Sequence, residues 1–129
     1  MKAITLRALW AWAVVHGPKR VENRNWRTSR RGEIAIHAGV DRAHDDADRR
    51  SLVAAGVDVP DDVPRGAVLG TVELLDVVDY PAAGDPDPYG LRDDPLATGP
   101  VCWILGDPRP LARPVPARGL QRFWSWDPD

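Results

Sequence analysis

A chain of 129 residues is long enough for one domain with one sizeable core and too short for two. Its 43% hydrophobic residues and six tryptophans exclude a disordered chain, and its single cysteine, Cys102, excludes an internal disulfide and a thiolate zinc site. No apolar run approaches the roughly 18 residues of a membrane span, and the first residues lack the pattern of a signal peptide. We therefore expect one cytoplasmic domain over residues 1–129, with no cofactor, metal or membrane.

The net charge of −2 argues against a general affinity for nucleic acid, but the charges are unevenly distributed. Eight of the 17 basic residues and only one of the 19 acidic residues lie in positions 1–31, a balance of +7. The rest of the chain carries −9. This asymmetry predicts a basic face on an acidic protein.

The first 27 residues predict a strand, a short helix and an extended segment. Apolar and polar residues alternate over 2–7, the period of a half-buried strand, and the apolar run 8–16 indicates a buried helix that Gly17 ends. If residues 20–27 are extended, alternate side chains share one face: Arg20, Glu22, Arg24 and Trp26. The charged side chains then lie on one surface, next to Lys19.

Residues 33–38 alternate as a strand that follows a basic turn at 28–32. Ile34 and Ile36 share one face of this strand, and His37 faces the other. His37 is therefore either directed into a cleft as an acid, a base or a hydrogen-bond donor, or is a structural histidine.

The middle of the chain predicts a helix and the longest strand. Residues 40–55 have acidic residues in their first turns and stop at Gly56, which indicates a peripheral helix. Residues 67–79 alternate as a strand. Unless a bulge changes the phase, Glu73 shares a face with three apolar residues: Leu69, Leu75 and Val77.

The last third of the chain contains a long loop, a strand and an aromatic end. Residues 80–98 hold four of the 13 prolines, and a loop of this length predicts a role such as a lid. Residues 101–105 predict a buried strand, whereas 107–116 are too rich in proline for a central strand or helix. The aromatic residues in 123–126 are expected to dock onto the core.

Several spaced blocks carry a resemblance. The motif G-x-K-x-x-E-x-R occupies residues 17–24, between T-L-R-x-x-W-A at 5–11 and R-G-E-I-A-I-H-A at 31–38. Further blocks are G-A-V-L-G-T-V-E-L-L-D at 66–76 and the closing segment 119–124. In this order the blocks are similar to the ASCH (ASC-1 homology) domain family.

The resemblance implies an α+β fold of the PUA-like superfamily, in which a small mixed β-barrel is flanked by two or more helices. It also implies a cleft beside the first helix that receives RNA, DNA or a nucleotide. The most similar branch contains the nucleic-acid-binding module of a transcriptional coactivator. Another branch contains small bacterial amidohydrolases acting on N4-acetylcytidine, and ribonuclease activity also occurs within the family.

Two positions depart from the family's pattern. Ala8 and Leu9 stand where the family often has Gln-Pro, so a polar amide near the cleft is missing. Glu22 stands where the amidohydrolase branch has a threonine nucleophile. A carboxylate cannot replace that hydroxyl in acyl transfer, although it can act as a general base on water.

The motif and the basic turn supply the candidate binding residues. Lys19 suits a phosphate or the polarisation of a carbonyl, and Arg24 suits bidentate contacts, unless either merely forms a solvated ion pair with Glu22. A cluster of three arginines beside Trp26 predicts a basic patch with an aromatic platform for single-stranded nucleic acid: Arg27, Arg30 and Arg31. Alternatively, Trp26 belongs to the core and the arginines are only solvated.

The first hypothesis is a module that binds RNA, DNA or a nucleotide through Lys19, Arg24, Trp26, Arg27, Arg30, Arg31 and His37. The alternative is a small hydrolase of a modified nucleoside or of RNA, in which Lys19 polarises the scissile group and Glu22 or Glu73 handles the proton. A domain that binds only protein is a third hypothesis.

Overall fold

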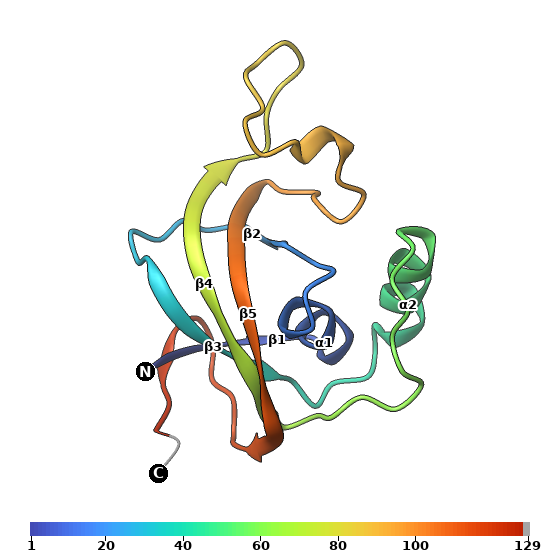
Figure 1. Ribbon diagram of the computed structural model, residues 1–129, viewed down its shortest axis with the longest axis vertical. Coiled ribbons are helices and arrows are strands. Elements are labelled where there is room, and N and C mark those ends of the chain that lie inside the picture. Colours follow the sequence, from blue (N-terminus) through green and yellow to red (C-terminus); the bar gives the residue numbers. More distant parts are fainter. Residues whose placement is uncertain (128–129) are drawn as a thin grey trace.

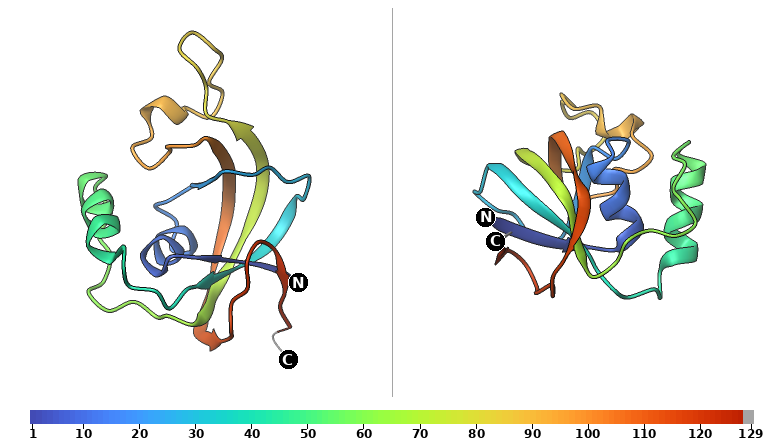
Figure 2. Two further views of the ribbon diagram at one scale, coloured as in Figure 1. Left: turned by 180° about the vertical axis from the view of Figure 1, so that it is seen from behind. Right: turned by 60° about the horizontal axis from the view of Figure 1, so that its bottom comes forward.

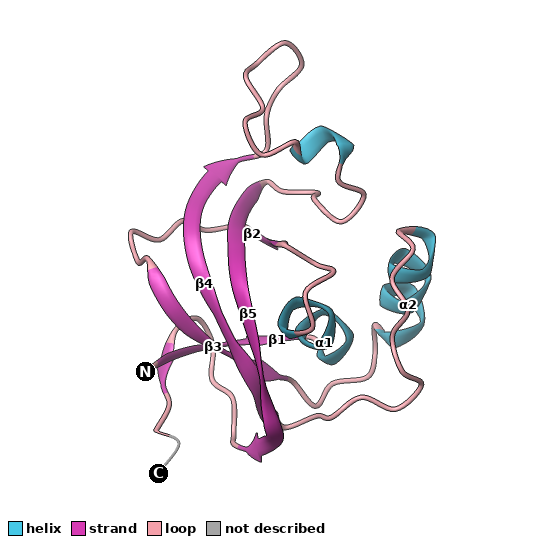
Figure 3. Ribbon diagram, viewed as in Figure 1, coloured by secondary structure: helices cyan, strands magenta, loops and turns pink. Residues whose placement is uncertain are grey.

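The computed structural model describes residues 1–127 and contains a curved mixed sheet with two α-helices on its concave side (Figure 1, Figure 3). The right-hand view of Figure 2 shows three layers, the sheet, α1 and α2. In chain order the elements are β1 (Lys2–Leu6), α1 (Ala8–Val15), β2 (Val21–Arg24), β3 (Gly32–Ala38), α2 (Asp45–Ala54), β4 (Ala67–Asp79), the 3-10 turn η1 (Leu91–Asp93), β5 (Val101–Pro116) and β6 (Trp124–Ser125).

The strand order is β2-β5-β4-β3-β1-β6. β1 and β3 are parallel, with Ala3 opposite Ala35, and the other neighbouring strands are antiparallel. The predicted α+β class with a mixed sheet and flanking helices is therefore confirmed. The sheet does not close into the expected barrel through backbone pairing within residues 1–127. Its edge strands, β2 and β6, do not pair with each other.

Side chains bridge the two edges of the open ladder. Arg24, at the end of β2, donates a hydrogen bond from Nη2 to the Thr5 carbonyl of β1 at 3.1 Å. Three rings then meet between the edges: Trp26 lies 4.9 Å from Trp103 and 5.7 Å from Phe123, and Trp103 stacks on Phe123 at 5.4 Å. We call Trp26, Trp103 and Phe123 the aromatic seam.

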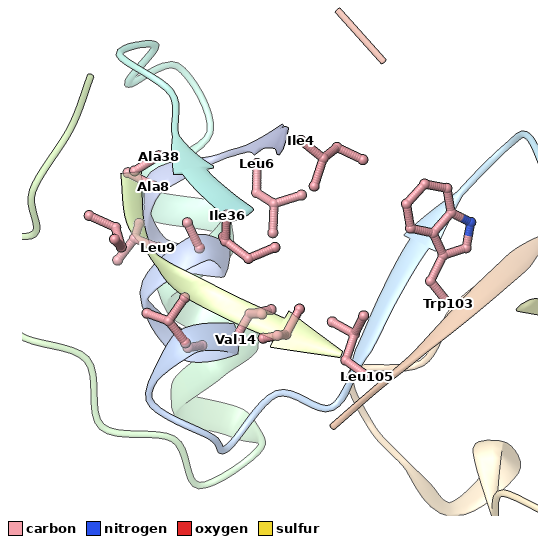
Figure 4. Packing of buried hydrophobic residues seen from close by; sticks show 14 of the residues in the cluster. Ile4, Leu6, Ala8, Leu9, Val14, Ile36, Ala38, Trp103 and Leu105 are labelled. Carbon is pink, nitrogen blue, oxygen red and sulfur yellow. The ribbon is translucent and has the colours of Figure 1, made fainter. Parts of the chain in front are cut away.

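The core lies between the concave face of the sheet and α1 (Figure 4). Helix α1 is apolar on all sides, and six of its eight residues are buried, as expected of a helix covered by both the sheet and α2. Trp103 is fully buried and belongs to the same core cluster as Ile4, Leu6, Ile36 and Leu105.

The end of α1 brings the chain to Lys19 as the sequence predicts. Gly17 follows the helix with φ +102°, a conformation that glycine adopts without strain, and its N–H donates to the Val14 carbonyl at 3.3 Å. The N–H of Lys19 donates to the Ala13 carbonyl at 3.1 Å. Lys19 is thereby held against the helix end.

Residues 107–116 are not a central strand, as expected, but the sequence did not predict that they continue β5 to Pro116 as an edge. Strand β2 pairs only with residues 101–104, so residues 107–116 of β5 pair with β4 alone. Proline is tolerated on such an edge, where no partner needs its missing N–H. The β4–β5 register also shifts three times, and one shift lies at Gly70, where a Cβ would be 2.5 Å from the Arg109 carbonyl oxygen.

The same bulges change the phase of β4. Leu69, Val72, Leu74 and Val77 all reach the core, a spacing that strict alternation does not allow. Leu75, predicted on the face of Leu69, is instead 57% exposed. Glu73 is half-buried opposite Glu33 and Gly106.

Helix α2 begins at Asp45, five residues later than predicted, and Leu52 is its buried apolar contact. The aromatic end docks as expected: β6 pairs with β1, and Trp124 and Trp126 are buried with Ala3 and Ala35. In the described part of the chain, no helix is long and apolar enough to cross a membrane.

Candidate functional site

A cavity of about 370 Å³ opens between β1, the start of α1, β2, α2 and the end of the 80–98 loop. Three residues of the predicted motif line it, namely Lys19, Glu22 and Arg24. Its volume lies in the range of small-ligand sites, roughly 300–1,000 Å³. The cavity is therefore the candidate site.

Lys19 is 3% exposed, and its ammonium group is bound on several sides. Nζ donates to the Val21 carbonyl and to Glu22 Oε1, the latter at 3.2 Å, and it lies 5.5 Å from the centre of the Trp10 ring. A buried cation requires such compensation, because desolvation penalises an isolated charge. Lys19 is consequently a fixed, paired group and not a solvated one.

Glu22 joins the two cations of the motif. While Oε1 accepts from Lys19, Oε2 lies 3.2 Å from Arg24 Nε. Arg24 Nε is buried and lacks a well-aligned hydrogen bond, although the pair is within ion-pair distance. The trio carries a net charge of +1, so the cavity favours a ligand with an anionic or strongly hydrogen-bond-accepting group.

Asn23 fixes the wall formed by the 80–98 loop. Its Oδ1 accepts from the N–H groups of Thr98 and Gly99, both at 2.9 Å, and its Nδ2 donates to the Leu96 carbonyl at 2.9 Å. Cys102 Sγ lies 3.9 Å from the same oxygen. Burial raises the pKa of the Cys102 thiol, which keeps it protonated and unreactive.

The opposite wall comes from α2 and Arg7. Arg7 Nη1 donates to Asp48 Oδ1 at 3.0 Å, and Ser51, one turn beyond Asp48, lines the cavity. Burial raises the pKa of the Asp48 carboxyl group, while the neighbouring Arg7 opposes that rise. Asp48 Oδ2 is buried without a hydrogen-bond partner.

The predicted basic patch lies outside this cavity. Arg27 pairs with Asp79 at 2.5 Å and Arg31 with Asp76 at 3.4 Å, whereas the Arg30 guanidinium lies over the Phe123 ring. Trp26 is a partly buried member of the aromatic seam. The predicted residues of the motif therefore line the cavity, whereas the predicted aromatic and basic patch lies outside it: Trp26, Arg27, Arg30 and Arg31.

His37 and Glu73 also lie apart from the cavity lining. His37 lines a second cavity of about 510 Å³, and both of its ring nitrogens have protein partners. Nε2 donates to the Ala117 carbonyl at 2.6 Å, and Nδ1 lies 3.1 Å from the Thr5 hydroxyl oxygen. Trp124 Nε1 in turn donates to that hydroxyl at 3.2 Å.

Sequence reasoning missed several cavity residues. Trp10 stands in the first block of the resemblance, the one signal that could have indicated its place in the lining. Asn23 lies within the motif at a position that the motif leaves open. Ser51 and Leu96 carry no local signal, because tertiary packing alone brings them to the site. Within residues 1–127 no group of three or more His, Cys, Asp or Glu side chains could hold a metal ion.

The cavity, the mixed sheet and the motif together define the class of protein: the chain belongs to the ASCH domain family, whose family model matches residues 4–89. Its curated relatives include activating signal cointegrator 1 of Homo sapiens, which is 29% identical over 124 residues, covering 92% of this chain and 21% of that protein. The Mus musculus protein of the same name is 28% identical over 130 residues, covering 96% and 22%. The chain thus spans about a fifth of the length of these relatives.

Among solved structures, the crystal structure of ASCH from Zymomonas mobilis is similar to this chain with a TM-score of 0.50 and 22% identity. The match covers 89% of this chain and 72% of that one. At this identity the likeness concerns the fold, and it agrees with the family assignment.

Proposed function

We propose that this domain binds a nucleotide unit of RNA or DNA in the cavity formed by Lys19, Glu22 and Arg24. The observation that carries the proposal is the ion-paired trio in a cavity of about 370 Å³, with the Trp10 ring beside it. Membership of the ASCH family supports the same conclusion.

The lining offers complementary groups for each part of a nucleotide. The net positive trio attracts a phosphate or a base carbonyl, and Glu22 can accept from an exocyclic amine. Trp10 supplies an aromatic surface for a base, and the Ser51 and Thr98 hydroxyl groups make no protein hydrogen bond in the described residues. These hydroxyl groups are available to a sugar or a base edge.

The test measures the binding of labelled mononucleotides and short oligonucleotides to wild type and to Arg24→Gln. Loss of one charged hydrogen-bonding group typically removes about 1.5–3 kcal/mol, so the affinity should fall by roughly tenfold or more. Arg113→Gln, an exposed position outside the cavity, is the matched control and should bind like wild type. If wild type binds none of these ligands, the proposal is wrong.

A second candidate function is hydrolysis of a modified nucleoside, favoured by the contact of 3.2 Å between Lys19 Nζ and Glu22 Oε1 inside the cavity. Lys19 would polarise an acyl carbonyl, and Glu22 would take a proton from the attacking water. Chromatography after incubation with N4-acetylcytidine tests it, by detecting cytidine and acetate. Glu22→Gln should abolish this turnover, and no turnover by wild type contradicts the hypothesis.

A further inference from the structure

Arg7 is a further cation in the lining of the candidate cavity, besides Lys19 and Arg24. Its side chain is 49% exposed, so it lies at the rim of the cavity, whereas Lys19 is buried. Nη1 of Arg7 donates to Asp48 Oδ1 at 3.0 Å, and Nε and Nη2 form no hydrogen bond within residues 1–127. Arg7 therefore keeps two donors that a ligand can use.

The position of Arg7 is fixed from two sides. Its carbonyl accepts from the Ala11 N–H at 2.9 Å in the first turn of α1, and its guanidinium group is bound to Asp48 of α2. A side chain that is held in place before binding loses less conformational freedom when a ligand arrives. Arg7 is thus preorganised for a ligand.

Asp48 is an energetically unfavourable partner for Arg7. The residue is 3% exposed, its Oδ2 has no hydrogen-bond partner within residues 1–127, and burial raises the pKa of its carboxyl group. A buried carboxylate with an unbonded oxygen opposes folding, and a pair with a half-exposed arginine offsets only part of this cost. Asp48 does not line the cavity, so it orients the guanidinium group without presenting its negative charge to a ligand.

The trio of Lys19, Glu22 and Arg24 lacks this arrangement. Glu22 lies within 3.2 Å of both cations and itself lines the cavity. Its carboxylate repels a phosphate group but can accept from an exocyclic amine of a base. The trio and Arg7 therefore suit different parts of a ligand.

We propose that Arg7 is the phosphate-binding residue of the cavity, that Asp48 is its positioning residue, and that the ligand is a nucleoside monophosphate with its base at the trio. This inference rests on the proposed function of the cavity and adds which part of the ligand each group binds. The free Nε and Nη2 atoms form one edge of the guanidinium plane, the fork that binds two oxygens of a phosphate. A nucleoside leaves this fork unused.

The experiment compares the four ribonucleosides with their 5′- and 3′-monophosphates by isothermal titration calorimetry. Wild type should bind a monophosphate more tightly than the nucleoside, and Arg7→Gln should lower this ratio of affinities by roughly tenfold, as for the loss of one charged hydrogen-bonding group. Arg24→Gln should weaken both ligands alike. Arg50→Gln is the control, because Arg50 is exposed on α2, lies outside the cavity and forms no ion pair within residues 1–127.

Two variants of Asp48 test its positioning role. Asp48→Asn keeps an oxygen acceptor for Arg7 and should retain most of the preference for the monophosphate. Asp48→Ala removes the acceptor and should lower the ratio toward that of Arg7→Gln, whereas a merely structural effect would weaken both ligands and leave the ratio unchanged. Thermal melting by circular dichroism confirms that the variants are folded.

The outcomes separate this inference from the proposed function. Equal affinity of wild type for nucleosides and monophosphates overturns the phosphate site while leaving the cavity proposal intact. A ratio in Arg7→Gln that equals the wild-type ratio, or an equal fall in Arg50→Gln, also overturns it. An unchanged ratio in Asp48→Ala overturns the role of Asp48, and the absence of any binding overturns both proposals.

Discussion

Glu22 gives Lys19 a buried counter-charge, and this explains why a carboxylate stands at this position. Without it, the ammonium group would be desolvated beside Trp10 with only the Val21 carbonyl for compensation. The two side chains restrain each other, so both charged groups have fixed positions in the lining of the cavity.

The buried Asp48 predicts a pH dependence of stability. Burial raises the pKa of its carboxyl group above the ordinary 3.8, so the folded state retains a proton that the unfolded state has lost. Relative to Asp48→Asn, wild type should therefore lose stability as the pH rises from 3.8 through the raised pKa. Urea unfolding of both proteins between pH 3.5 and 7 measures this, and a difference that does not change with pH would contradict it.

At the scale of elements, Asn23 joins β2 to the loop that follows β4. The loop is long and rich in proline, yet its last residues are held by the three hydrogen bonds to one amide side chain. The wall of the cavity thus depends on a residue that contributes little to the sheet's core.

Replacing Asn23 with alanine should loosen this wall. The N–H groups of Thr98 and Gly99 lose their acceptor, and the expected destabilisation is about 1–3 kcal/mol. Hydrogen–deuterium exchange should show faster exchange at these two amides. Asn25→Ala, at an exposed neighbouring position, is the control. If the Thr98 and Gly99 amides exchange at the same rate in both variants, the Asn23 side chain does not hold the loop.

The elements that the sequence predicts well are those governed by local chemistry. Gly17 ends α1, and alternation defines β1, because helix stops and strand periodicity depend on adjacent residues. The bulges of β4 and the proline-rich half of β5 arise from the pairing of these two strands with each other. No local sequence pattern predicts them. The motif predicts that Lys19, Glu22 and Arg24 lie together, but the walls formed by Asn23 and α2 depend on tertiary packing.

At the scale of the whole molecule, side chains connect the two edges of the sheet, which do not pair through their backbones within residues 1–127. Phe123 lies just before β6 and reaches Trp26 beyond β2, so its ring connects the two edges of the sheet.

Phe123→Ala should therefore lower the free energy of unfolding by about 2–3 kcal/mol, less than the 3–5 of a fully buried aromatic residue. Phe123→Leu, which keeps an apolar side chain, should have a smaller effect. Urea denaturation measures both, and a loss below about 0.5 kcal/mol for the alanine variant would show that the ring does not hold the edges together.

The two ends of the described chain lie side by side, because Met1 and Trp126 exchange backbone hydrogen bonds at 3.0 and 2.8 Å. They lie on the side of the molecule away from α2 (Figure 1, Figure 2). Helix α2, on the other side of the molecule, forms one wall of the candidate cavity. The first and last described strands are thus anchored to each other at a place separate from that wall.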